Sequence, residues 1–259
     1  GLSPRDVALF YDWFASTAKV VTVFSQGVNQ SATGTDKVNA IINCHLATGR
    51  IGLPGRGPFS ITGQPNAMGG REVGGLANML AAHMDFDLAS IDRVGRFWGS
   101  DRVATKPGLK AVDLFEAVGD GRIKALWIMA TNPVDSMPEA DAVRAALRAC
   151  PFVVVSEMNR STDTALEAHV RLPAAGWGEK DGTVTSSERT ISRQRAFLPC
   201  AGEAKPDWWA LAEIGRRLGF ADAFAFGAAR DVFSEYAALT GINADTPLQL
   251  DISELIRLT

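Results

Sequence analysis

The sequence predicts an α/β protein, in which a Rossmann-like parallel sheet is flanked by helices. Short apolar runs rich in β-branched residues alternate with longer segments of helical periodicity. The runs at 123–130, 152–155 and 169–172 are separated by helical segments, so their strands are joined by crossovers and should lie parallel. Hydrophobic residues make up 46% of the 259 residues, which is enough to bury a large core.

The N-terminal part predicts a helix, a strand, a polar loop and a second helix. Ser3 suits the N-cap of a helix that runs to residue 16. The β-branched run at 20–24 predicts a buried strand. The polar loop at 25–34 precedes a helix that ends at Gly49, where glycine favours termination. The loop that leaves the carboxyl end of such a strand is the usual ligand position in α/β proteins.

A glycine-rich segment follows. Nine of the 25 glycines lie between Gly49 and Gly75, and residues 50–75 predict neither helix nor strand. Compact domains rarely contain so long an irregular stretch unless it serves a site. Arg71 is a cation in the closing half of this segment, and a guanidinium among glycines suits a small planar oxyanion. The segment therefore predicts an anion site, with an ordinary surface arginine as the alternative.

The rest of the chain predicts further elements in order. A helix at 76–84 precedes an irregular stretch at 85–107, in which Trp98 would be an anchor. Ser136 and Glu139 have the spacing of a capping box for a following helix. The remaining helices are expected at 109–118, about 138–149, shortly after residue 163, about 206–218 and about 229–239.

Polar loops follow two strands of the predicted sheet. They are Thr131-Asn132-Pro133 and Ser156-Glu157-Met158-Asn159. Because adjacent parallel strands end at the same edge, these loops would offer N–H groups, a hydroxyl, an amide and a carboxylate to a phosphate or a base. Ordinary turns and helix caps use the same residue types and remain the alternative. Neither common glycine-rich nucleotide fingerprint is present in the sequence.

Composition excludes several functional classes. The net charge of 26 − 29 = −3 removes the simplest case for binding nucleic acid or an anionic membrane. The sequence shows no signal peptide and no apolar run near the ~20 residues that span a bilayer. Three widely spaced cysteines favour a reduced, cytoplasmic setting over a disulfide framework or a metal site. The cysteines and histidines do not have the spacing of metal ligands; they are Cys44, Cys150, Cys200, His45, His83 and His169. We expect the histidines in the core or on the surface.

Four motifs follow one another along nearly the whole chain. They are SQGVNQSATGTDKVNAIINCHLATGRIG, GPFSITGQPNAMGGREVGG, ALWIMATNPVDSMP and LPAAGWGEKDGTVTSSERTISRQRAFLP. Together they resemble the molybdopterin oxidoreductase family and, within it, the catalytic subunits of bacterial assimilatory nitrate reductases. The resemblance implies a molybdenum bis(molybdopterin guanine dinucleotide) cofactor (bis-MGD) and oxygen-atom transfer that reduces nitrate to nitrite. It also implies an electron-donor protein or subunit, and a [4Fe–4S] cluster in an N-terminal part outside this sequence.

The resemblance implies roles for residues at matching positions. Gln64 and Arg71 match an active-site funnel, in which Arg71 would orient nitrate and stabilise charge on the oxygen being cleaved. Glu157 would accept hydrogen bonds from a guanine edge, while Ser186 stands where the family commonly has asparagine. No metal ligand is expected within the chain. The matching cofactor positions are Gly27, Val28, Asn29 and Gln30 beside the pterin, Thr131, Asn132, Pro133, Ser156 and Glu157 at a guanine dinucleotide, and Glu179, Gly182, Ser187 and Arg189 near the cofactor.

The resemblance also implies that the chain is the middle of a larger multidomain enzyme and is inactive alone. Residues 1–64 would end one α/β cofactor-binding domain and 65–175 would form a second, Rossmann-like one. Residues 176–259 would be an extended segment with C-terminal helices that return toward the cluster domain. The alternatives are a formate dehydrogenase-type enzyme and a non-catalytic scaffold like the large iron–sulfur subunit of respiratory complex I. Formate dehydrogenases tend to carry an arginine where this chain has Thr62, which favours nitrate.

Overall fold

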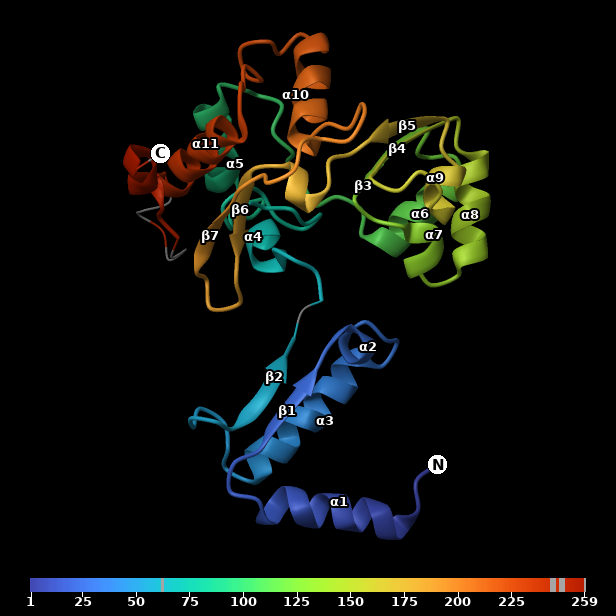
Figure 1. The fold of residues 1–259 in the computed structure, drawn as a ribbon, viewed down its shortest axis with the longest axis vertical. Helices are drawn as coiled ribbons and strands as arrows, with labels where there is room; N and C mark the ends of the chain where they lie inside the picture. Colours follow the sequence, from blue (N-terminus) through green and yellow to red (C-terminus); the bar gives the residue numbers. More distant parts are fainter. Residues whose placement is uncertain (62, 243–245, 247–249, 259) are drawn as a thin grey trace. The chain divides into compact units, whose positions relative to one another are not determined.

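A computed structural model describes residues 1–61, 63–242, 246 and 250–258, which form two units, Gly1–Ala67 and Met68–Thr259 (Figure 1). Thr62, on which the argument against formate rests, lies outside the described residues. No helix in the described ranges has the length and apolar character needed to cross a membrane. The predicted roles of 1–64, 65–175 and 176–259 as parts of separate domains stay predictions.

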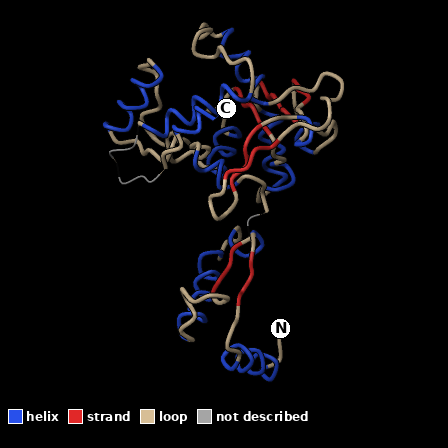
Figure 2. Tube along the Cα trace, turned by 60° about the vertical axis from the view of Figure 1, so that its left-hand side comes forward, coloured by secondary structure: helices blue, strands red, loops and turns tan. Residues whose placement is uncertain are grey.

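The first unit is a two-stranded parallel sheet with helices. Its elements are α1 (Pro4–Ser16), β1 (Val21–Phe24), α2 (Gln26–Asn29), α3 (Gly34–Ala47) and β2 (Gly57–Ser60). β1 and β2 run side by side in both views, with Val23 opposite Phe59 (Figures 1 and 2). The Ser3 hydroxyl accepts a hydrogen bond from the Asp6 N–H at 3.1 Å, which confirms the predicted cap of α1. The predicted helix, strand and second helix are therefore confirmed, but the strand is not buried as predicted, since Val21 and Val23 are 48% and 55% exposed, and the predicted loop at 25–34 contains α2.

The second unit contains the predicted Rossmann-like sheet. β3 (Ala125–Met129), β4 (Phe152–Glu157) and β5 (Val170–Pro173) lie parallel in that order. The helices around them are α6 (Ala111–Gly119), α7 (Pro133–Ser136), α8 (Ala140–Ala149) and α9 (Asp163–Leu166). Val153 and Val155 of β4 face a core with Val143 and Leu147 of α8 and Val118 of α6. The predicted α/β fold class is confirmed by this parallel, helix-covered sheet.

The glycine-rich segment is more regular than predicted. β2 and α4 (Ala67–Glu72) both lie within residues 50–75, where neither helix nor strand was expected. β2 is stabilised by pairing with β1, a contact between distant residues that local periodicity does not reveal. α4 contains Gly69 and Gly70, which disfavour helix intrinsically, so its neighbours rather than propensity must hold it.

The predictions for residues 76–107 were wrong in both halves. The expected helix at 76–84 is a series of turns, in which Ala82 and His83 adopt positive φ and Met84 is fully buried. The stretch expected to be irregular contains α5 (Leu88–Trp98). The Asp87 carboxylate caps α5 by accepting from the N–H groups of Ala89 and Ser90, an ordinary N-cap signal. The indole N–H of Trp98 donates to Glu235 at 3.0 Å, which ties α5 to α11 (Ala229–Gly241).

Two further local predictions were wrong. Glu139 stands at the N-cap of α8 in a left-handed conformation, and Ser136 ends α7 instead, so they form no capping box. The chain between β5 and α10 (Asp207–Arg217) contains an antiparallel hairpin that was not predicted. Its strands are β6 (Gly182–Thr185) and β7 (Ile191–Gln194), preceded by the short helix η1 (Trp177–Glu179). The chain's described part ends in η2 (Ser253–Leu258).

Candidate functional site

The carboxyl ends of β1 and β2 bring two predicted site segments together within the first unit. Gly27, Val28 and Asn29 form α2 directly after β1, and Gln30 ends it. The Gln26 side-chain amide donates to Gln64 Oε1 at 3.0 Å, and the Ser25 hydroxyl donates to the Ile61 carbonyl. Gln64 therefore lies beside the loop that was matched to the pterin, although 38 residues separate it from Gln26.

A close approach fixes the geometry of that loop. A Cβ on Gly34, the first residue of α3, would lie 2.4 Å from the Asn29 carbonyl oxygen. Only glycine lets α3 begin so close to α2. The Ser31 hydroxyl donates to the Val28 carbonyl at 2.9 Å and accepts from Lys37 at 2.9 Å, which holds the end of the loop. The predicted pterin-proximal segment is thus braced by backbone packing.

Arg71 belongs to the second unit, where its side chain is exposed in the last turn of α4. The helix ends in a tight glycine turn, because the N–H of Gly75 donates to the Gly70 carbonyl at 2.8 Å. Gly74 has a φ of +94°, and a Cβ there would lie 2.6 Å from the Leu80 carbonyl oxygen. The glycines predicted to shape an anion loop therefore close a short helix that presents Arg71.

The residue after Arg71 was not predicted as part of any site. Glu72 is 2% exposed, and its Oε1 accepts from Arg189 Nε at 2.7 Å. Burial and, secondly, the nearby Glu72 carboxylate raise the pKa of Tyr236 on α11 to about 12, while Arg189 opposes the shift. His83 Nε2 lies 3.9 Å from the same carboxylate oxygen, beyond hydrogen-bonding distance. A carboxylate beside an arginine is common in sequences, so nothing local indicated this burial.

The strand-end loops of the second sheet meet at one edge, as predicted. Met129 is in register with Ser156, and the Ala130 N–H donates to the Ser156 carbonyl at 3.3 Å. Asn132 Oδ1 accepts from the N–H and the hydroxyl of Thr164, at 3.0 and 2.7 Å. Ser156 is buried and accepts from the Trp127 indole at 2.8 Å. These two polar side chains brace the loops, which leaves backbone groups and Thr131 for a ligand.

Two carboxylates lie near that edge. Glu157 Oε1 accepts from the N–H groups of Met158 and Asn159, at 2.8 and 3.2 Å. Glu179 joins two backbone segments, because its carboxylate accepts from the N–H groups of Gly176 and Ala201. Glu157 is only half-buried, so its other oxygen suits the role predicted for a guanine edge. Pro133 is buried at the start of α7 and supports its loop from inside.

A hollow of about 400 Å³ lies beside this edge, lined by Met158, Pro173, Trp177, Glu179 and Phe197 among others. The Trp177 and Phe197 rings pack edge to face, with centroids 5.1 Å apart, and both are largely exposed. Open aromatic faces and a carboxylate beside strand-end N–H groups are the chemistry that a nucleotide base requires. The donor set therefore fits a guanine nucleotide at this edge. The aromatic pair was missed because its members are 20 residues apart, in segments without regular periodicity.

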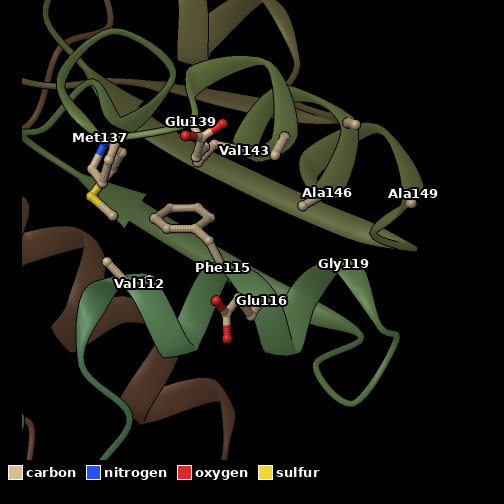
Figure 3. Close-up of a pocket in the computed structure, with 12 residues that line it drawn as sticks. Val112, Phe115, Glu116, Gly119, Met137, Glu139, Val143, Ala146 and Ala149 are labelled. Atoms are coloured by element: carbon tan, nitrogen blue, oxygen red, sulfur yellow. The ribbon is translucent and has the colours of Figure 1, made fainter.

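A larger groove of about 520 Å³ runs between α6 and α8 (Figure 3). The Phe115 ring and the Met137 side chain lie side by side at one end, and alanines of α8 line the rest. Its charged lining residues are two carboxylates, Glu116 and Glu139, with no cation to bind a phosphate. None of the predicted site residues lines it, so we assign it no part in the candidate site.

The remaining predicted residues lie on the hairpin. Gly182 opens β6 opposite Gln194, and Ser187 is exposed in the turn. Arg189, in that turn, is bonded to Glu72 as described. Among the described residues, no group of three or more His, Cys, Asp or Glu side chains is placed to hold a metal ion.

Comparison with known proteins places the chain in a family. The molybdopterin oxidoreductase family model matches residues 8–217. A nitrate reductase from Klebsiella oxytoca is 55% identical over all of this chain and 30% of its own length. One from Shewanella frigidimarina is 54% identical over 93% of this chain and 26% of its own. An F420-dependent formate dehydrogenase subunit alpha from Methanocaldococcus jannaschii is 32% identical over 88% of this chain and 33% of its own.

The chain thus spans about a third or less of the length of these curated relatives. The family model covers the strand-end loops of both sheets, α4 and the hairpin, so the match includes each segment of the candidate site. On this evidence the chain belongs to the molybdopterin oxidoreductase family.

Proposed function

We propose that this chain is the central part of a molybdenum bis-MGD enzyme that reduces nitrate to nitrite. The observation that carries the proposal is Arg71, an exposed guanidinium presented by a short helix that ends in a glycine turn. Its planar, two-pronged donor geometry suits a trigonal oxyanion such as nitrate. The nitrate reductases at 54–55% identity support nitrate over formate, because the formate dehydrogenase relative is only 32% identical.

The cofactor would be held by segments of this chain at the carboxyl ends of both sheets. When bound, it would supply the molybdenum to which nitrate loses an oxygen atom. The backbone at Thr131–Pro133 and the free side of Glu157 would bind one guanine dinucleotide, with Trp177 and Phe197 beside the base. Gly27–Gln30 would pass near the pterin, and Gln64, tied to Gln26, would lie at the funnel. Glu179, Gly182 and Ser187 would support this edge.

Within the site, Arg71 would orient nitrate and then stabilise the charge that develops as an N–O bond breaks. Electrons would come from a [4Fe–4S] cluster elsewhere in the polypeptide, fed by a donor protein or subunit in the cytoplasm. In this proposal the residues of this chain do no redox chemistry themselves. They bind the cofactor's ends, position the substrate and supply positive charge.

The test uses the full-length protein with its cofactor, assayed with reduced viologen and nitrate, and separately with formate. Arg71→Ala should lower kcat/KM for nitrate by about 100-fold, because a charged donor to the transition state is lost. Arg71→Lys should recover only part of this loss, since an ammonium lacks the planar fork. Arg102→Ala, which removes another exposed arginine of the same unit, is the matched control. Unchanged nitrate kinetics in Arg71→Ala, or turnover of formate alone, would refute the proposal.

A further inference from the structure

An ion pair between buried Glu72 and Arg189, whose side chain is 45% exposed, joins two segments that are 117 residues apart. Glu72 ends α4 directly after Arg71, while Arg189 lies in the turn of the β6–β7 hairpin (Figure 1). The Nε–Oε1 distance of 2.7 Å is that of a short, charge-assisted hydrogen bond. This bond therefore ties the end of α4 to the hairpin.

Two features indicate that the pair serves to hold the end of α4 in one position. Glu72 is 2% exposed, and a carboxylate is rarely buried unless a charged partner compensates for its lost hydration. Arg189 has a φ of +65°, a left-handed conformation that costs energy for a residue with a Cβ. The hairpin turn thus accepts backbone strain at the residue whose side chain reaches Glu72.

A tight turn lies close to the pair as well, since His83 Nε2 is 3.9 Å from the Glu72 carboxylate. Residues 80–84 turn tightly, with the Leu80 N–H donating to the Met84 carbonyl at 2.7 Å, and Met84 is fully buried. Gly74 packs against the backbone of Leu80 and Ala81. Tyr236 of α11 also lies near the pair, since burial and, secondly, the Glu72 carboxylate raise the pKa of Tyr236. The end of α4 is therefore bounded by a turn, a helix and a hairpin.

We propose that Glu72 is a positioning residue, which together with Arg189 fixes the end of α4 and thereby the direction in which Arg71 presents its guanidinium to an oxyanion. This inference rests on the proposed function, in which Arg71 binds an anion. It assigns the Arg189 side chain to α4 rather than to the cofactor. A six-residue helix with two glycines has too little intrinsic stability to set the direction of a side chain alone.

The structural arm of the test measures hydrogen exchange in the full-length holoenzyme. The reporter amides are those of Val73, Gly74 and Gly75, which donate to carbonyls of α4. Glu72→Gln and Arg189→Gln should each speed their exchange about 10-fold, and the double variant should add little to the stronger single one. In Arg189→Lys, which keeps the cation, the exchange rates of these amides should be closer to those of the wild type.

An exposed ion pair of the same unit provides the matched control. Arg96 and Asp92 of α5 are also 2.7 Å apart, but their side chains are 75% and 61% exposed. Asp92→Asn and Arg96→Gln remove the same charges from a surface pair, whose contribution is small because water solvates both groups. Neither should change exchange at residues 73–75.

The kinetic arm asks whether Glu72 acts through Arg71. In otherwise wild-type enzyme, Glu72→Gln should raise the KM for nitrate about 10-fold with a smaller change in kcat, because a displaced guanidinium binds the anion less well. In the Arg71→Ala background the same substitution should change kcat/KM less than about 2-fold. A general loss of structure would instead lower kcat/KM by the same factor in both backgrounds.

The outcomes separate this inference from the proposed function. If the enzyme reduces nitrate but Glu72→Gln leaves exchange at residues 73–75 unchanged, or acts equally with and without Arg71, the positioning role is overturned. If the wild-type enzyme does not reduce nitrate while exchange still depends on Glu72 and Arg189, the proposed function falls and the structural link from α4 to the hairpin stands.

Discussion

The two units differ in what lies in their interiors. In the second unit the core beside β3–β5 is apolar, with Leu147, Val153 and Val155 at 0–1% exposure. In the described part of the first unit, the buried residues are Gly34, His45, Arg50 and Gly57, and none is a large apolar side chain. The second unit is therefore stabilised mainly by removal of apolar surface from water, and the first by specific polar contacts.

The polar interior of the first unit has a definite structure. Arg50, which is 3% exposed, donates to the carbonyls of Ala15 and Thr17 at the end of α1 and to the Thr48 hydroxyl. Its guanidinium also lies 4.8 Å from the centre of the Phe14 ring. The last carbonyls of a helix lack partners within the helix, so one buried cation satisfies several acceptors at once. Such a core depends on single residues more than an apolar core does.

The largest expected effect is in the apolar core. Leu147→Ala should lower the free energy of unfolding of the second unit by about 3 kcal/mol, since it removes buried methyl groups and leaves a cavity. Urea unfolding followed by hydrogen exchange measures the loss in each unit. Leu166→Ala is the control, because Leu166 is 55% exposed. Equal loss of protection in residues 1–67 would contradict the comparison, since it would mean that the two units unfold together.

A smaller effect is expected in the polar core. Arg50→Met keeps an apolar stem but removes the donors to Ala15 and Thr17, so it should cost the first unit about 2 kcal/mol. Hydrogen exchange should show the loss in residues 1–67 and leave β3–β5 protected. Arg5→Met on the exposed face of α1 makes the same chemical change without buried partners. If both variants behaved alike, the buried contacts of Arg50 would not matter to stability.

The same contrast explains how much of the fold could be predicted. The β3–β5 sheet was predicted because Val153 and Val155 lie in an apolar run flanked by helical patterns, and apolar burial leaves a periodic trace in sequence. β2 was not predicted, because the sequence at Gly57 and Pro58 has no strand pattern and the strand depends on pairing with β1. α5 was not predicted, although Asp87 at its N-cap and the left-handed Gly99 at its C-cap mark its ends.

The candidate site likewise has one part that the sequence predicts and one that it does not. The edge shared by Thr131–Pro133 and Ser156–Glu157 follows from parallel strand order, and the register of Met129 with Ser156 confirms it. The Glu72–Arg189 pair could not be predicted, because burial of a charge is a tertiary property without periodicity. The roles of Arg71, Gln64 and the cofactor-binding residues stay predictions until the enzyme is assayed.

The smallest effect expected concerns protonation in the polar core. His45 is fully buried, and its Nε2 lies 2.8 Å from the Thr22 hydroxyl. Burial and, secondly, the nearby Arg50 cation lower the pKa of His45 below 6.5. The unfolded chain then binds a proton more readily than the folded unit, so stability is full above about pH 6.5 and falls as the pH drops toward the lowered pKa.

Protection of residues 1–67 from hydrogen exchange, corrected for intrinsic rates, should therefore weaken as the pH falls from about 7 to about 5 in the wild type. His45→Gln, which keeps a polar partner for Thr22, should remove this dependence from the first unit and leave that of the second unchanged. Residues 68–259 of the same protein are the internal control. An unaltered pH dependence in His45→Gln would show that another group titrates, and that the first unit does not rely on a neutral histidine in its interior.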